Sequence, residues 1–236
     1  MIFFWQEPGE KLIIAHVTKI KEKQMKKFLI TVAITGLIGG MAFAQTNVVS
    51  SANVVGYNQI TIPSNQFVLV SLDFNNESNS INSLFGTLPT GSQVSLWNAT
   101  LQSWVVIQKT RSGWGTGGTN VLNLGSGAFI KVPAETNIYF SGDVPMDPTS
   151  TVHVASGFKF VSYPYPVDMA FTNTALAKEA PTGDQVSAWS NGWIVYQKTR
   201  SGWGAGTNLQ IKVGQALFYK GVTNRAADEV KPYTIN

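Results

Sequence analysis

Tryptophan, lysine and arginine side chains recur twice in this sequence at matching positions. The octapeptide Gln-Lys-Thr-Arg-Ser-Gly-Trp-Gly occurs without a single difference at 108–115 and at 197–204, and further tryptophans precede each copy. An indole face can stack on a sugar ring, and a neighbouring guanidinium pairs well with a carboxylate or sulfate. The residues expected to form one such binding surface per copy are Trp97, Lys109, Arg111, Trp114, Trp189, Lys198, Arg200 and Trp203.

A purely structural interpretation of these residues stays open. Tryptophans on strands usually belong to the core, and lysines on outer strand faces commonly protect a sheet from edge aggregation. The preference for a core position over a ligand-binding position differs among the three tryptophan pairs. It is strongest for Trp104 and Trp193 and weaker for Trp114 and Trp203. For Trp97 and Trp189 the two interpretations are nearly equal.

Residues suited to catalysis or to metal binding are scarce. After the leader described below, His153 is the only histidine, and it lies in a Val-His-Val alternation typical of a solvated strand face. The chain has no cysteine and no G-x-S-x-G motif, which argues against thiolate metal sites and a serine-hydrolase elbow. Asp143 and Asp147 are flanked by prolines that suit a linker better than a calcium loop. We therefore expect no catalytic residue, no metal and no cofactor, and a hydrolase using turn carboxylates is the least favoured function.

Short strands and short helices are expected to position the repeated residues. Runs rich in β-forming residues occur at 67–72 and 158–163, and closing strands are expected at 127–131 and 216–220. Ser80 can cap a helix over 81–85, and Asn173 can cap one over 174–179.

The segment 185–199 predicts a β-hairpin. Asn191-Gly192 between two β-rich runs is typical of a two-residue type I′ turn, which would place Ser190 opposite Trp193. Alternation then puts Trp193 and Val195 on the core face, and Trp189 on the other face beside Lys198. In the first copy, the same alternation places on the core face Val94, Leu96, Trp104 and Val106. It places on the other face Gln93, Ser95, Trp97, Ile107 and Lys109.

The chain divides into two homologous units. Pro-Thr-Gly recurs at 89–91 and 181–183, and Phe67 matches Phe158. Such internal similarity predicts a first half over 54–144 and a second half over 145–236. We expect an all-β fold of two tandem β-sandwich or barrel-like units of about 90 residues, each with one short helix.

The N-terminal part predicts export. Met25-Lys26-Lys27, the apolar run 28–43 and the Ala42-Phe43-Ala44 cleavage site have the order of a secretory signal peptide, expected to be helical over 25–44. A transmembrane anchor is the alternative, but three glycines interrupt a run barely long enough to span. Residues 1–24 are interpreted as an extension upstream of the true start, and 45–53 as a linker.

Charge argues against a nucleic-acid partner. Of the 17 basic and 13 acidic residues, six and three lie in residues 1–44, which leaves 11 and 10 in the exported part. A basic surface of the kind that binds nucleic acid is therefore not indicated.

Several short motifs together resemble a known group of proteins. They are an F-x-x-V-S-x-P strand at 158–164, a Gly-Asp-Gln-Val…Trp hairpin at 183–193, a Gly-x-Ala-x-Phe strand at 214–220, and Ala-Asn-Val-Val-Gly-Tyr at 52–57. The chain resembles uncharacterised exported β-repeat proteins of verrucomicrobial-type bacteria. The resemblance implies a secreted protein of the periplasm, cell surface or extracellular space, and it brings no catalytic residues.

The sequence thus predicts a non-enzymatic protein that binds extracellular polysaccharide, acidic or sulfated, through the duplicated Trp/Lys/Arg surfaces. The alternative is a structural cell-surface or matrix component that associates with itself. No membrane span is expected once the leader is removed.

Overall fold

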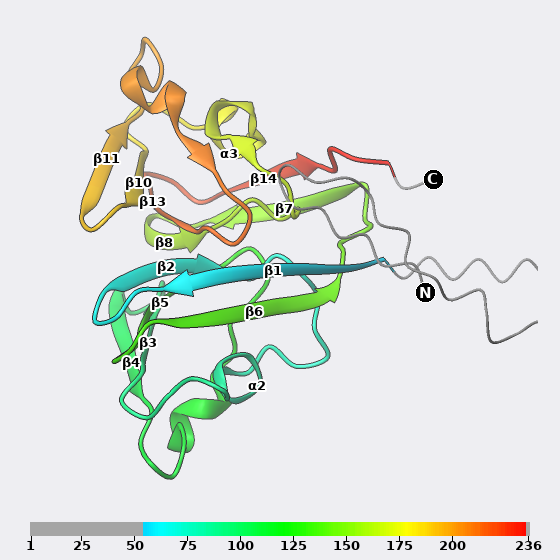
Figure 1. Ribbon diagram of the computed structural model, residues 1–236. Helices are drawn as coiled ribbons and strands as arrows, with labels where there is room; N and C mark the ends of the chain where they lie inside the picture. Colours follow the sequence, from blue (N-terminus) through cyan, green and yellow to red (C-terminus); the bar gives the residue numbers. More distant parts are fainter. Residues whose placement is uncertain (1–53, 235–236) are drawn as a thin grey trace, which may run out of the picture. The chain divides into compact units, whose positions relative to one another are not determined.

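Strands dominate the computed structural model, which describes residues 54–234 (Figure 1). The expectation of an all-β fold is confirmed. The strands are β1 (Val55–Ile62), β2 (Phe67–Ser71), β3 (Gln93–Asn98), β4 (Ser103–Gln108), β5 (Gly127–Lys131), β6 (Thr136–Asp143), β7 (Thr149–Val154), β8 (Gly157–Val161), β9 (Met169–Ala170), β10 (Gln185–Trp189), β11 (Trp193–Gln197), β12 (Gln210–Ile211), β13 (Leu217–Gly221) and β14 (Arg225–Val230). The predicted extension 1–24, the signal peptide 25–44 and the linker 45–53 lie outside the described residues, as do the first two residues of the 52–57 motif.

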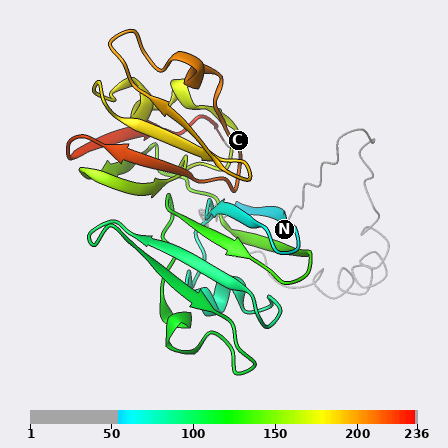
Figure 2. The ribbon, with the colours of Figure 1, turned by 90° about the vertical axis from the view of Figure 1, so that its left-hand side faces the viewer.

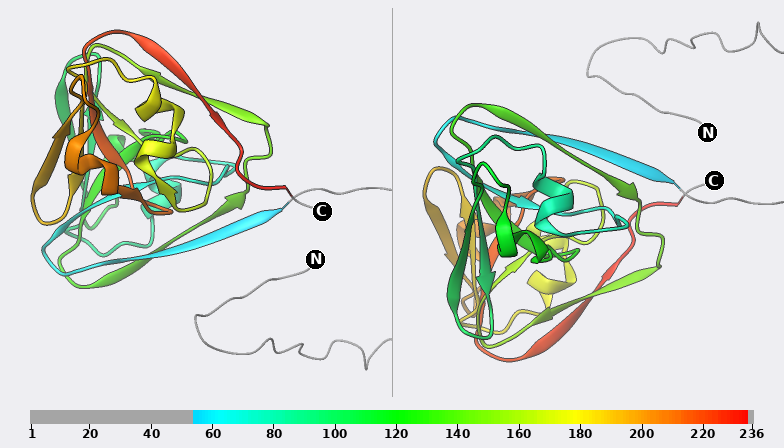
Figure 3. Two further views of the ribbon diagram at one scale, coloured as in Figure 1. Left: turned by 90° about the horizontal axis from the view of Figure 1, so that it is seen from above. Right: turned by 90° about the horizontal axis from the view of Figure 1, so that it is seen from below.

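Two four-stranded antiparallel sheets have the same order of elements. The first half contains the sheet β2-β5-β3-β4, and the second half contains β8-β13-β10-β11 (Figure 2). Each half adds a two-stranded ribbon, β1 with β6 and β7 with β14, which Figure 3 shows as long neighbouring strands. A further small pair, β9 with β12, occurs in the second half.

Each half has its own hydrophobic core between the ribbon and the four-stranded sheet. In the first half, Ile138 and Phe140 of the ribbon pack with Val94 and Ile130 of the sheet, and all four are buried. In the second half the corresponding core includes Val152 of the ribbon. Alternation along each strand sends these apolar side chains inward.

Short helices lie beside each core. Ser80 caps α2 (Ile81–Phe85) by accepting the Ser83 N–H at 3.2 Å, as predicted. In the second half, the predicted cap is wrong by one residue: Thr174 caps α3 (Ala175–Lys178), after the 3-10 turn η2 (Phe171–Asn173). Two further 3-10 turns follow the repeated octapeptides, η1 (Gly115–Thr119) and η3 (Gly204–Asn208).

The predicted hairpin register is wrong by one residue. Trp189 lies opposite Trp193, so the loop has three residues instead of two. A type I′ turn needs positive φ at both central residues, but only Asn191, at 56°, has it. The one-residue shift turns every side chain of β11 to the opposite face.

The same correction applies to the first hairpin. Trp97 lies opposite Trp104, so these two share a face, and Val105 and Ile107 point to the core instead of Trp104 and Val106. Gln102, with φ of 49°, takes the left-handed conformation in this loop.

A third apolar cluster joins the two four-stranded sheets. Its buried members come from both halves and are Leu69, Phe129, Phe160 and Ala216. The sheets approach closely at Gly127, where an added Cβ would lie 2.4 Å from the Cβ of Ala216. All described residues belong to one compact unit of the chain, so this cluster is part of the fold.

Candidate binding surfaces

Trp97 and Trp189 lie where the two halves meet. The Trp97 indole N–H donates to the carbonyl oxygen of Phe158 at 2.7 Å, and that of Trp189 donates to the carbonyl oxygen of Phe67 at 2.8 Å. Both indoles are half-buried. Because Phe67 and Phe158 occupy matching positions, each half gives the other the same hydrogen bond.

The indoles of Trp114 and Trp203 are core side chains. Each is 4% exposed, and their N–H groups donate to the carbonyl oxygens of Phe85 at 3.1 Å and Ala177 at 3.0 Å. Neither offers an indole face to a ligand, which corrects the expectation that they form part of a surface platform. The glycines beside them let the chain turn so that the indole points inward.

Lys109 and Lys198 cover these buried indoles. Their ammonium groups lie 5.8 Å and 5.5 Å from the ring centroids of Trp114 and Trp203. The Lys109 ammonium also donates to the carbonyl oxygens of Gly86 and, at 2.6 Å, of Leu88. Such a lysine holds the end of α2 against the buried ring, a cation–π arrangement that stabilises the fold.

Arg111 and Arg200 are exposed at the tips of the tight turns Thr110–Gly113 and Thr199–Gly202. The described residues contain two ion pairs, Lys212 with Asp168 and Arg225 with Asp184, so neither tip arginine is paired within them. The predicted set therefore separates into interface indoles, lysine-covered core indoles and exposed arginines.

Exposed indoles occur instead at Trp104 and Trp193, which the sequence assigned to the core. Trp104 is 43% exposed and Trp193 38%, and both touch the aromatic cluster between the halves. Each lies edge-on to its strand partner, Trp104 to Trp97 at 5.0 Å and Trp193 to Trp189 at 5.1 Å. A four-residue loop assumed for the first hairpin and a three-residue loop assumed for the second would have indicated this exposure.

The strands that carry these indoles are open edges. β4 and β11 end their sheets, and in the part of the chain that is described each forms a ladder only with its hairpin partner. Neither strand contains a charged residue or a proline, the usual protection of an edge. Beside the indoles, Val106 is 59% and Val195 55% exposed.

The opposite edges, β2 and β8, are covered. The Gln102 side-chain amide accepts the N–H of Phe158 at 2.8 Å and donates to its carbonyl oxygen at 3.0 Å, as a further strand would. On β2, the Phe67 carbonyl accepts the Trp189 indole N–H. Side chains of one half thus close an edge of the other.

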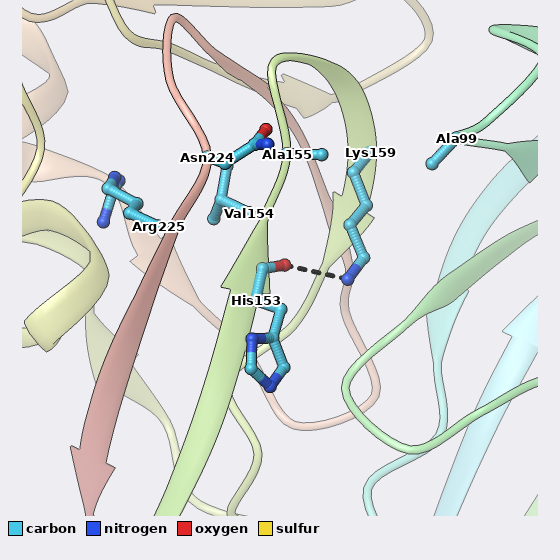
Figure 4. Close-up of a pocket in the computed structure, with 7 residues that line it drawn as sticks. All are labelled: Ala99, His153, Val154, Ala155, Lys159, Asn224 and Arg225. Carbon is cyan, nitrogen blue, oxygen red and sulfur yellow. Dashed lines mark hydrogen bonds between the residues drawn. The ribbon is translucent and has the colours of Figure 1, made fainter.

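A shallow hollow lies beside β7 and β8 (Figure 4). It has a volume of about 410 Å³. Its lining residues are Ala99, His153, Val154, Ala155, Lys159, Asn224 and Arg225. The Lys159 ammonium donates to the carbonyl oxygen of His153 at 2.8 Å.

Buried acidic groups are held by structural hydrogen bonds. Asp73 accepts from the Ser71 hydroxyl at 2.7 Å and from the Gly214 N–H of the other half, and burial raises its pKa to about 6. Burial also raises the pKa of Glu229, which accepts the N–H groups of the first turn of α3. Both carboxylates therefore have structural partners.

The buried Asp184 carboxylate accepts from Arg225 at 3.1 Å, from the Val222 N–H at 2.8 Å and from the Tyr219 hydroxyl. Burial, together with this carboxylate, raises the pKa of Tyr219. Within residues 54–234 no group of three or more acidic or histidine side chains is placed to hold a metal ion. None of the described helices has the length and apolar character needed to cross a membrane.

Comparison with known proteins gives no relative: no family model, no curated protein and no solved structure matches this chain.

Proposed function

We propose that this protein is an exported, non-enzymatic structural component that associates with further copies of itself through the edge strands β4 and β11. Export rests on the basic, apolar and A-x-A segments of residues 25–44. We further infer that the halves are copies of one ancestral β-sandwich unit, because their sheets share one strand order and their octapeptides are identical.

The observation that carries the proposal is the state of the sheet edges. An exposed, uncharged edge strand is a template for pairing with another strand, and soluble proteins usually block it. Within residues 54–234, side chains from the other half block β2 and β8, whereas no such side chain pairs with β4 or β11, and neither of these two strands contains a charged residue. Of the four outer edges of the two four-stranded sheets, β4 and β11 are therefore the two that stay open.

A second copy of the chain is the partner that fits these edges best. β4 and β11 carry nearly the same residues, Ser-Trp-Val-Val-Ile-Gln and Trp-Ile-Val-Tyr-Gln, so an antiparallel pair of edges from two copies is nearly self-complementary. Basic and acidic residues nearly balance after the leader, so copies repel each other little. The exposed apolar side chains also continue the aromatic cluster that already joins the halves.

Sedimentation velocity of the exported protein over a wide concentration range tests this proposal. We expect the mean mass to rise with concentration, and the double variant Val106→Lys/Val195→Lys to remain monomeric with an unchanged thermal unfolding curve. Val230→Lys is the matched control, because Val230 is 67% exposed but lies on β14. A wild-type protein that stays monomeric throughout, or a control that dissociates as completely, would refute the proposal.

Polysaccharide binding is the second candidate, and the exposure of Trp104 and Trp193 favours it. Each indole presents part of its surface on an outer strand, and an arginine is exposed in the turn after the same strand. Trp104→Ala/Trp193→Ala should then abolish retention on an acidic polysaccharide gel, whereas Trp114→Phe should leave it unchanged. Equal retention of both variants would exclude this surface as the binding site.

A further inference from the structure

The hollow beside β7 and β8 is lined by basic and apolar residues. It is formed by the β3–β4 loop of the first half and by two segments of the second half, 153–159 and 224–225. Three of its seven lining residues are basic or histidine and none is acidic. A volume of about 410 Å³ lies within the range of small-molecule sites.

Lys159 is the cation of this hollow that has no counter-ion within residues 54–234. Its side chain is half-buried, and neither ion pair of the described residues includes it. Among the described residues its ammonium donates one hydrogen bond, to the His153 carbonyl oxygen, although an ammonium has three N–H donors. Burial lowers its pKa, because the charged form loses hydration that no carboxylate replaces.

The remaining lining residues suit a ligand with one charged group and an otherwise less polar body. The side-chain Oδ1 of Asn224 accepts the Ser156 N–H at 2.8 Å. The side-chain NH₂ group of Asn224 is therefore left to donate to a ligand or to water. Ala99, Val154 and Ala155 supply apolar wall. Arg225 adds little free charge, because its guanidinium pairs with Asp184 and points away from Lys159 (Figure 4).

We propose that this hollow binds one singly charged oxyanion, a carboxylate or a sulfate, carried on a ring of about monosaccharide size, with the Lys159 ammonium as its counter-ion and the Asn224 amide as a second donor. A charge-assisted hydrogen bond of this kind is about twice as strong as a neutral one. The ligand would replace the counter-ion that the protein itself does not provide.

The lysine of this hollow has no counterpart in the first half. Val68 occupies the position that matches Lys159, between Phe67 and Leu69, and it packs against the core of its half. The proposed site is therefore expected once per chain, whereas the edge strands occur twice. It is independent of self-association, because it lies on neither β4 nor β11.

Titration calorimetry with glucuronate, glucose 6-sulfate and glucose tests the site and distinguishes the two oxyanions. We expect one site per chain for at least one charged ligand, no heat with glucose, and at least about tenfold weaker binding to Lys159→Met. Lys159→Arg keeps the charge and should bind within a few-fold of wild type. Lys212→Met is the control and should bind normally. It removes an exposed lysine that pairs with Asp168 and does not line the hollow.

The proposal is overturned if neither charged ligand binds at tens of millimolar, if glucose binds as well, or if Lys159→Met keeps full affinity. A thermal unfolding curve for each variant shows whether it is folded. Should Lys159→Met fail to fold, chemical-shift changes of the Lys159 and Asn224 amides in the wild-type protein decide the question: shifts confined to the hollow support the site, and their absence refutes it.

Discussion

Trp97 donates its indole N–H to the carbonyl oxygen of Phe158 at 2.7 Å, although the two residues belong to different four-stranded sheets. Trp189 and Phe67 make the reciprocal bond. The surfaces on which the halves meet are thus alike, and the contact is part of the fold.

Replacing the interface indoles by phenylalanine should destabilise the protein unequally. Trp189→Phe leaves the Phe67 carbonyl without its indole donor, whereas after Trp97→Phe the Phe158 carbonyl still accepts from Gln102 at 3.0 Å. A fully buried carbonyl left without a donor costs about 1–3 kcal/mol, and the cost at the half-buried Phe67 should be at the lower end of this range. Urea unfolding should therefore give the lower free energy of unfolding for Trp189→Phe, and the reverse order would contradict the assignment.

Gly127→Ala should force the two sheets apart. Its new Cβ would lie 2.4 Å from the Cβ of the buried Ala216 and 3.0 Å from the carbonyl oxygen of Val70 in β2. Overpacking of this kind costs about 1–3 kcal/mol. Gly192→Ala is the control, because nothing lies within 4 Å of its added Cβ, and its melting temperature should stay near that of wild type. Equal melting temperatures for the two variants would argue against a tight contact at Gly127.

Asp73 should make stability depend on pH. Burial raises its pKa from 3.8 to about 6, so between these values the folded protein binds a proton that the unfolded chain has released. The free energy of unfolding should therefore fall as the pH rises from about 4 to about 6, by about 3 kcal/mol at most, and then become constant.

Asp73→Asn isolates this effect. An asparagine amide can accept the Gly214 N–H and donate to the Ser71 hydroxyl, but it does not titrate. The difference in stability between wild type and variant should therefore change across pH 4–6, even though Glu229, whose pKa is also raised, titrates in both proteins. Parallel stability curves would show that Asp73 keeps its ordinary pKa.

Lys109 and Lys198 occupy matching positions but should not be equally important. Both lie over a buried indole, whereas only Lys109 also donates to the carbonyl oxygens of Gly86 and Leu88. Lys109→Met should lower the free energy of unfolding by about 1 kcal/mol more than Lys198→Met does. Equal losses in urea unfolding would mean that the hydrogen bonds at the end of α2 contribute nothing.

Local patterns in the sequence were sufficient for part of the fold. Runs of β-forming residues located the strands of the two four-stranded sheets, and Ser80 with Gly86 located α2 to the residue, whereas the ribbon strands β1, β6 and β14 were not located. The register of the second hairpin was not predictable from Asn191-Gly192 alone, because these two residues also fit a three-residue loop in which Asn191, and not Gly192, takes positive φ. That difference decides which face Trp193 occupies.

The candidate site was predicted less well than the fold, for a tertiary reason. Trp97 was correctly placed on the face away from the core of its own half, but that face is covered by the other half. Alternation along a strand identifies two faces and does not say what packs on the second. Equally, nothing in the repeated octapeptides indicates that the ring of Trp114 is buried under Lys109.

The closed edges β2 and β8 determine the geometry of any assembly built through the four-stranded sheets. Each four-stranded sheet has one edge strand that is blocked by the other half and one that is open. A chain therefore offers two edge strands to which further copies can attach. Building blocks of valence two join into rings or unbranched fibres, whereas a branched network needs a third point of attachment. Because Gln102 blocks the edge of β8, it would thus help to limit such an assembly to rings or unbranched fibres.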